Sequence, residues 1–161
     1  MASGDTLLIF LPQGNEPPAT NFATFDTRNN HPVLDFDDTT SESAIWSAIL
    51  PRNYAGGGLT VYIYFSAIAT SGDVDWDVSF ERIGDRQQDV DVDGFAAVNS
   101  VINQTVPGTP GFVDRVNVTF TDGADMDGIL VGEQFRIKIA RNVADTAVGD
   151  LELHAISIKE T

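Results

Sequence analysis

The sequence contains no cysteine among its 161 residues. Disulfide bonds, thiolate metal ligands and cysteine nucleophiles are therefore excluded. Positive charge is also scarce: 9 lysines and arginines stand against 24 aspartates and glutamates, giving a formal net charge of −15 at pH 7. A surface this negative repels phosphate backbones and anionic lipid headgroups. Nucleic acid and membrane surfaces are therefore not expected partners.

No hydrophobic run approaches the roughly 20 residues that a membrane-spanning helix needs. The apolar stretch of residues 7–11 ends at Pro12, and residues 1–5 before it carry no basic side chain. This pattern does not match a secretory signal, so we expect no export through a cleaved secretory peptide. Hydrophobic residues still make up 42% of the chain, which is enough to fill the core of one compact domain.

Alternation of apolar and polar residues is the main structural signal, and it is clearest in residues 74–81. A β-strand turns alternate residues to opposite faces, whereas a helix scatters them. We therefore expect Trp76 in the core and Asp75, Asp77 and Glu81 on an exposed face. Trp46, in another alternating segment, is also expected in the core because large rings are usually buried.

Ten segments are predicted as strands, and no segment has a convincing helical pattern. The predicted strands are residues 6–11, 21–26, 31–36, 43–50, 59–69, 74–81, 98–106, 112–121, 133–141 and 150–159. Turn-forming Gly, Pro, Asn and Asp residues separate them, and the long connection of residues 84–97 suits jelly-roll wiring. We predict an all-β antiparallel sandwich with a jelly-roll fold. Residues 1–30 are expected to form an extended arm on the domain or a neighbour, and residues 31–161 the sandwich.

Two acidic segments are candidate metal sites. Asp89, Asp91 and Asp93, followed by Gly94, match the opening of a calcium-binding loop. The match fails further along, because Ser100 occupies the twelfth position where a bidentate glutamate is needed. We therefore expect solvated aspartates and no metal, with calcium at these three residues as the alternative. The second acidic cluster, in a glycine-rich loop, consists of Asp122, Asp125 and Asp127.

No catalytic residues are predicted. His31 and His154 are isolated in the sequence, and no serine-nucleophile motif accompanies them. We expect both histidines to lie at the surface or at a sheet edge. The glycine run of residues 56–58 lacks the lysine and following helix of a phosphate-binding loop. The chain is expected to have no enzymatic activity.

Tyr62 and Tyr64 share one face of a predicted strand whose other face is apolar. Either this strand is central with both faces covered, or the tyrosines belong to a contact surface, where a phenol ring can stack on a sugar. We favour burial, because nearly continuous apolar runs are typical of inner strands.

Several short segments together resemble uncharacterised virion proteins of tailed bacteriophages and prophages. The segments are residues 36–39 (Phe-Asp-Asp-Thr), 50–54 (Leu-Pro-Arg-Asn-Tyr), 56–59 (Gly-Gly-Gly-Leu), 69–76 (Ala-Thr-Ser-Gly-Asp-Val-Asp-Trp), 80–82 (Phe-Glu-Arg), 106–109 (Val-Pro-Gly-Thr) and 132–136 (Gly-Glu-Gln-Phe-Arg). The resemblance extends from about residue 21 to the C-terminus. It implies a jelly-roll virion component, of the kind found as capsid decoration or cement proteins, in fibre heads, or as carbohydrate-binding modules on tails.

We therefore predict a virion structural protein, assembled in the host cytoplasm, that docks on the head shell and stabilises it. Its expected partners are the major capsid protein or other virion proteins, and it is expected to be a homo-oligomer, with a trimer favoured. The alternative is a carbohydrate-binding module of a tail or fibre tip, with Tyr54 and acidic loop residues as sugar or calcium contacts. The candidate contact residues are Phe22, Phe25, Tyr54, Tyr62 and Tyr64.

Overall fold

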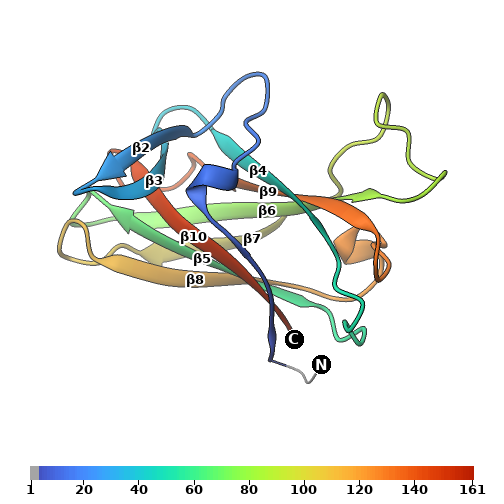
Figure 1. Ribbon diagram of the computed structural model, residues 1–161. Coiled ribbons are helices and arrows are strands. Elements are labelled where there is room, and N and C mark those ends of the chain that lie inside the picture. Colours follow the sequence, from blue (N-terminus) through green and yellow to red (C-terminus); the bar gives the residue numbers. More distant parts are fainter. Residues whose placement is uncertain (1–3) are drawn as a thin grey trace.

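The computed structural model describes residues 4–161, which form two antiparallel sheets packed face to face (Figure 1). Sheet A consists of β1 (Thr6–Phe10), β2 (Thr24–Arg28), β3 (His31–Phe36), β5 (Leu59–Ala67), β8 (Val113–Phe120) and β10 (Leu151–Glu160). Sheet B consists of β4 (Ser43–Ile49), β6 (Asp73–Ile83), β7 (Asn99–Thr105) and β9 (Gln134–Arg141). Each of the ten predicted strands overlaps one of these, so the all-β prediction is confirmed.

The chain passes repeatedly between the two sheets, which is jelly-roll wiring. The strand order is β2-β3-β10-β5-β8 in sheet A, with β1 also paired to β10, and β4-β9-β6-β7 in sheet B. Two short 3-10 turns, η1 (Pro12–Gly14) and η2 (Ala124–Met126), complete the elements of residues 4–161. No helix in this part of the chain is long and apolar enough to cross a membrane.

Aromatic side chains from both sheets fill the space between them. Trp46 and Trp76 are buried, as predicted. Trp76 of sheet B meets the rings of Phe36 and Phe65 of sheet A edge-on, with ring centroids 5.1 and 5.6 Å apart. Such tilted aromatic pairs contribute about 0.5–1.5 kcal/mol each beyond the burial of their surface. These contacts therefore help to fix the two sheets against each other.

Residues 4–30 lie against the rest of the chain. Strand β1 pairs with the second half of β10, and β2 pairs with β3 at the edge of sheet A. Between them the chain crosses to sheet B, where the indole N–H of Trp46 donates to the carbonyl of Leu11 (3.0 Å). The backbone N–H of Ile45 donates to Oδ1 of Asn15 (3.1 Å). This segment thus connects the edges of the two sheets.

The outer face of sheet B differs from the prediction, because the connection of residues 84–98 folds back over part of it. Phe95 from this connection lies under Lys138 and Arg136, with 4.6 and 5.3 Å from the cations to the ring centroid. Glu81 is only 4% exposed beside Arg136 and accepts its hydrogen bond (2.9 Å). Asp75 is 9% exposed and accepts the backbone N–H of Asn103 (2.6 Å). The expectation that Asp75 and Glu81 are exposed was wrong.

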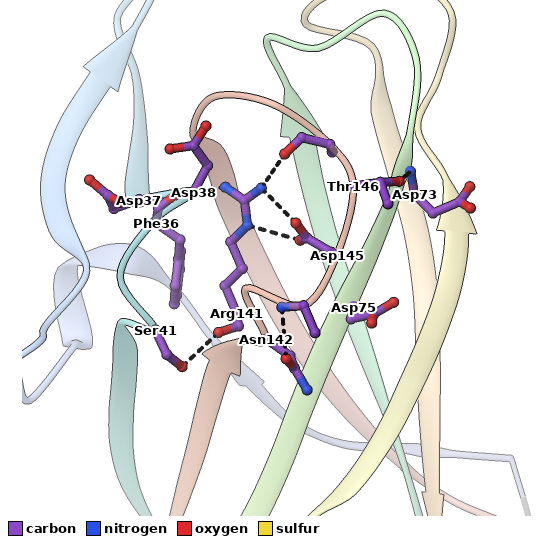
Figure 2. A network of polar contacts seen from close by, with 12 residues as sticks. Phe36, Asp37, Asp38, Ser41, Asp73, Asp75, Arg141, Asn142, Asp145 and Thr146 are labelled. Atoms are coloured by element: carbon purple, nitrogen blue, oxygen red, sulfur yellow. Dashed lines mark hydrogen bonds and ion pairs between the residues drawn. The ribbon is translucent and has the colours of Figure 1, made fainter.

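One fully buried cation, Arg141 at the end of β9, is surrounded by acceptors from the connection that follows it and from β3 (Figure 2). Its guanidinium donates to both carboxylate oxygens of Asp145 at 2.9 and 3.1 Å. It also donates to the carbonyls of Gly149 (2.7 Å), Ala147 (2.7 Å) and Phe36 (3.2 Å). The side chain therefore ties the end of β3 to the connection between β9 and β10.

Replacing Arg141 is expected to destabilise the fold strongly. Arg141→Met would leave the buried Asp145 carboxylate and three carbonyls without their donor, which costs about 3–5 kcal/mol in comparable cases. Arg141→Lys keeps the charge but has fewer donors, so its loss of stability should lie between zero and that of Arg141→Met. Urea unfolding measures both, and the exposed Arg52→Met serves as the control with a change of less than about 0.5 kcal/mol. A loss below about 1 kcal/mol for Arg141→Met would contradict this assignment.

Candidate functional site

Tyr62 and Tyr64 lie on the outer face of β5, a central strand of sheet A. The residues between and beside them, Val61, Ile63 and Phe65, face the core and are fully buried. The two tyrosines are half-buried, because sheet A is an outer layer of the two-layered sandwich. Our preference for their burial was therefore wrong: the strand is central, but its outer face is not covered by a further layer of residues 4–161.

The register of the strands places further polar side chains around these tyrosines. Ser157 and Asn117 lie opposite Tyr62, on β10 and β8, and Arg115 lies opposite Tyr64. We call the outward residues of β1, β10, β5 and β8 that lie around Tyr62, from Thr6 and Thr60 as far as Tyr64, the tyrosine face. They are Thr6, Ile9, Thr60, Tyr62, Tyr64, Arg115, Asn117, Thr119, Ala155, Ser157 and Lys159. None of them is acidic, although the chain carries a strong negative charge.

Two cations lie close to the Tyr62 ring. The guanidinium carbon of Arg115 is 5.1 Å from the ring centroid, and Nζ of Lys159 is 5.8 Å from it. They come from the strands on either side of β5. The electron-rich ring attracts both, which holds their long side chains over the face. Within the described residues 4–161 no such contact is found for Tyr64, so we assign the tyrosine ring available for stacking to Tyr64.

The same outer face becomes acidic beyond Tyr64. Glu152 forms an ion pair with Arg28 and accepts the hydroxyl hydrogen of Ser66 (2.8 Å). The pKa of Asp35 is raised to about 6, first by burial and then by the carboxylates of Glu152, Asp26 and Asp150. Sheet A therefore presents a cationic, aromatic half and an acidic half.

Ser66 and His154 are in contact but are not arranged as a nucleophile and its base. Nε2 of His154 lies 2.8 Å from Oγ of Ser66, whose hydrogen is directed to Glu152. Nε2 is therefore assigned as the donor in this contact and does not accept the serine proton. His154 is half-buried and lines a hollow with Arg28 and His31, and burial lowers its pKa. His31 is exposed, with Nδ1 3.0 Å from the carbonyl oxygen of Asn29.

Tyr54 lies in the connection between β4 and β5 and is only 8% exposed. Its hydroxyl donates to Asp122 (2.7 Å) and accepts the backbone N–H of Gly58 (2.8 Å). Burial, followed by the hydrogen bond to Asp122, raises the pKa of Tyr54 well above its ordinary value. The residue lines an open hollow of about 530 Å³ together with Asp122 and Leu130. Its ring supports the loop and offers little surface to a ligand.

Phe22 and Phe25 lie near the edge of the sandwich and are 45% and 52% exposed. They line a hollow of about 290 Å³ with Pro12, Gln13 and Asn15. Among the predicted contact residues, these two are therefore the most exposed, but the structure does not bring them together with Tyr54 or with the tyrosine face.

The acidic segments are organised by hydrogen bonds within their own loops. Asp93 accepts the backbone N–H of Asp89 (2.5 Å), and Asp89 accepts that of Asp91 (3.0 Å). Asp125 accepts the backbone N–H of Thr121 (2.7 Å). Within residues 4–161, no group of three or more His, Asp or Glu side chains is arranged to hold a metal ion.

Sequence reasoning identified Tyr62 and Tyr64 but missed their partners. Arg115, Asn117 and Thr119 alternate along one segment, as do Ser157 and Lys159 along another. This alternation marks them as outward residues. The pairing of β5 with β8 and β10 is what places them beside the tyrosines, and the alternation carries no information about pairing.

Comparison with known proteins identifies the fold of this chain but not its family. No protein-family model matches the chain, and no curated protein is significantly similar to it. A family 35 carbohydrate-binding module from an environmental isolate superposes with a TM-score of 0.58 at 16% identity, covering 95% of this chain and 93% of that one. The CBM22-1 xylan-binding domain of Paenibacillus barcinonensis Xyn10C superposes with a TM-score of 0.55 at 13% identity, covering 99% of this chain and 96% of that one.

A two-module xylanase structure from Clostridium thermocellum, CBM22-1 with GH10, gives a TM-score of 0.52 at 9% identity over 98% of this chain and 29% of that one. At such low identities these similarities show a shared fold, the jelly-roll β-sandwich that carbohydrate-binding modules use. They do not transfer a ligand or a binding residue to this chain.

The raised pKa of Asp35 predicts how stability depends on pH. The folded protein holds this proton up to about pH 6, whereas the unfolded chain releases it near pH 3.8. The favourable contribution of protonated Asp35 is therefore lost as the pH rises from about 4 to about 6. Asp35→Asn should have the same free energy of unfolding as the wild type near pH 4 and a free energy about 1 kcal/mol higher near pH 7. This difference is smaller than the full pKa shift would give, because Asp35 is partly exposed. Urea unfolding at both pH values checks this, and a difference that does not change with pH would contradict it.

Proposed function

We propose that this chain is a non-catalytic carbohydrate-binding module that holds its ligand on the tyrosine face. The observation that carries the proposal is the partly exposed Tyr64 on a central strand, near the hydroxyl of Ser157 and the amide of Asn117. An aromatic ring stacks on the C–H face of a pyranose, while hydroxyl and amide groups exchange hydrogen bonds with the sugar hydroxyls. The shared jelly-roll fold of the carbohydrate-binding modules supports the proposal.

The form of the face favours an extended polysaccharide chain over a single enclosed sugar. Its residues come from four adjacent strands, so they are spread over a sheet surface. Strands on both sides hold β5 by backbone hydrogen bonds, which fixes the tyrosines before a ligand binds. Such preorganisation reduces the entropy lost on binding.

Tyr64→Ala is expected to weaken polysaccharide binding about five-fold or more, because it removes the stacking surface. Affinity electrophoresis through gels that contain xylan, mannan, β-glucan or galactan measures the effect. Phe112→Ala is the matched control, since it removes another exposed ring, just before β8, that is not part of the tyrosine face. Wild-type binding to none of these polysaccharides, or equal losses in the two variants, would contradict the proposal.

Docking on a capsid, as predicted from sequence, is the second candidate function and depends on a different surface. Exposed apolar side chains lie along residues 11–25, namely Leu11, Phe22 and Phe25. Apolar side chains of this kind contribute to protein contacts when they are buried in an interface. The homo-oligomer predicted from the sequence, with a trimer favoured, is part of this second proposal.

Co-sedimentation with intact capsids tests the docking candidate. The double variant Phe22→Ser/Phe25→Ser should reduce the bound fraction, because it removes two exposed aromatic anchors. Tyr64→Ala should leave the bound fraction unchanged. Absence of wild-type protein from the capsid pellet at saturating concentration would exclude this function.

A further inference from the structure

Arg115 and Lys159 are free to bind an external anion. Within residues 4–161 the ion pairs involve Arg28, Arg82, Arg136 and Arg141, and neither Arg115 nor Lys159 has a carboxylate partner within 4.0 Å. The Tyr62 ring holds both cations on the outer surface.

One carboxylate lies beside these two cations: Asp114 accepts the backbone N–H of Arg115 (2.7 Å) but forms no ion pair with its guanidinium. The other residues of the tyrosine face are neutral, and Glu152, further along this side of the sheet, is paired with Arg28 and accepts a hydrogen bond from Ser66. At physiological ionic strength, exposed charges further away than about 8 Å are largely screened. The local positive charge therefore decides what binds here, even though the chain carries −15 overall.

We propose that the tyrosine face recognises a largely neutral polysaccharide that carries isolated carboxylate groups. This inference rests on the proposed function and names its ligand class. Tyr64 stacks on a sugar ring, and Arg115 and Lys159 bind carboxylates on the same or a neighbouring sugar through charge-assisted hydrogen bonds. Densely charged polyanions are disfavoured, because their many charges meet the acidic remainder of the surface.

The test compares a neutral polysaccharide with its lightly carboxymethylated derivative. The neutral polymer is the one that binds best in the electrophoresis series above, and its carboxymethyl groups are spaced further apart than the Debye length of about 8 Å. The wild type should bind the derivative about three-fold or more tightly than the parent polymer at physiological salt, as expected for two exposed ion pairs.

The double variant Arg115→Gln/Lys159→Gln should bind both polymers with equal affinity. Arg52→Gln/Arg86→Gln is the matched control, because it removes the same charge from exposed loop positions and should keep the preference. Equal binding of both polymers by the wild type, or a preference that survives in the Arg115→Gln/Lys159→Gln protein, overturns the inference and leaves the proposed function standing. Binding of neither polymer overturns both.

Discussion

The buried guanidinium of Arg141 is the interaction on which the arrangement of the sandwich depends. A cation without exposure to water is tolerated only when its charge and its donors are matched, and here one carboxylate and three carbonyls match them. Those acceptors lie at the end of β3 and in the connection that leads into β10. The charge thus holds the connection that leads into β10 against the end of β3, its neighbour in sheet A.

The placement of β10 has a direct effect on the outer surface. This strand pairs with β5 along its length, and that pairing brings Lys159 and Ser157 beside Tyr62. The partner strand β8 supplies Arg115 and Asn117 from the other side. A surface with aromatic, cationic and amide groups therefore arises from three strands that are far apart in the sequence. None of these strands contains the whole pattern.

The sequence predicted the strands and the core well, because alternation along one segment determines which face of a strand is apolar. Trp46 and Trp76 were placed correctly for this reason. Asp75 and Glu81 were placed wrongly, since the cover over their face comes from residues 84–98 and from the neighbouring strands, Asn103 and Arg136 among them. Arg141 was missed because its acceptors reach back to Phe36, and no local pattern reports a contact over 105 positions.

The central position of β10 also has a consequence for synthesis on the ribosome. Translation proceeds from the N-terminus, so β1, β3 and β5 emerge long before the strand that joins them in sheet A. Until β10 leaves the exit tunnel, the nascent chain exposes unpaired strand edges next to apolar side chains, and such edges invite association with other chains. We therefore expect the newly made polypeptide to depend on chaperone protection until residues 151–160 are available.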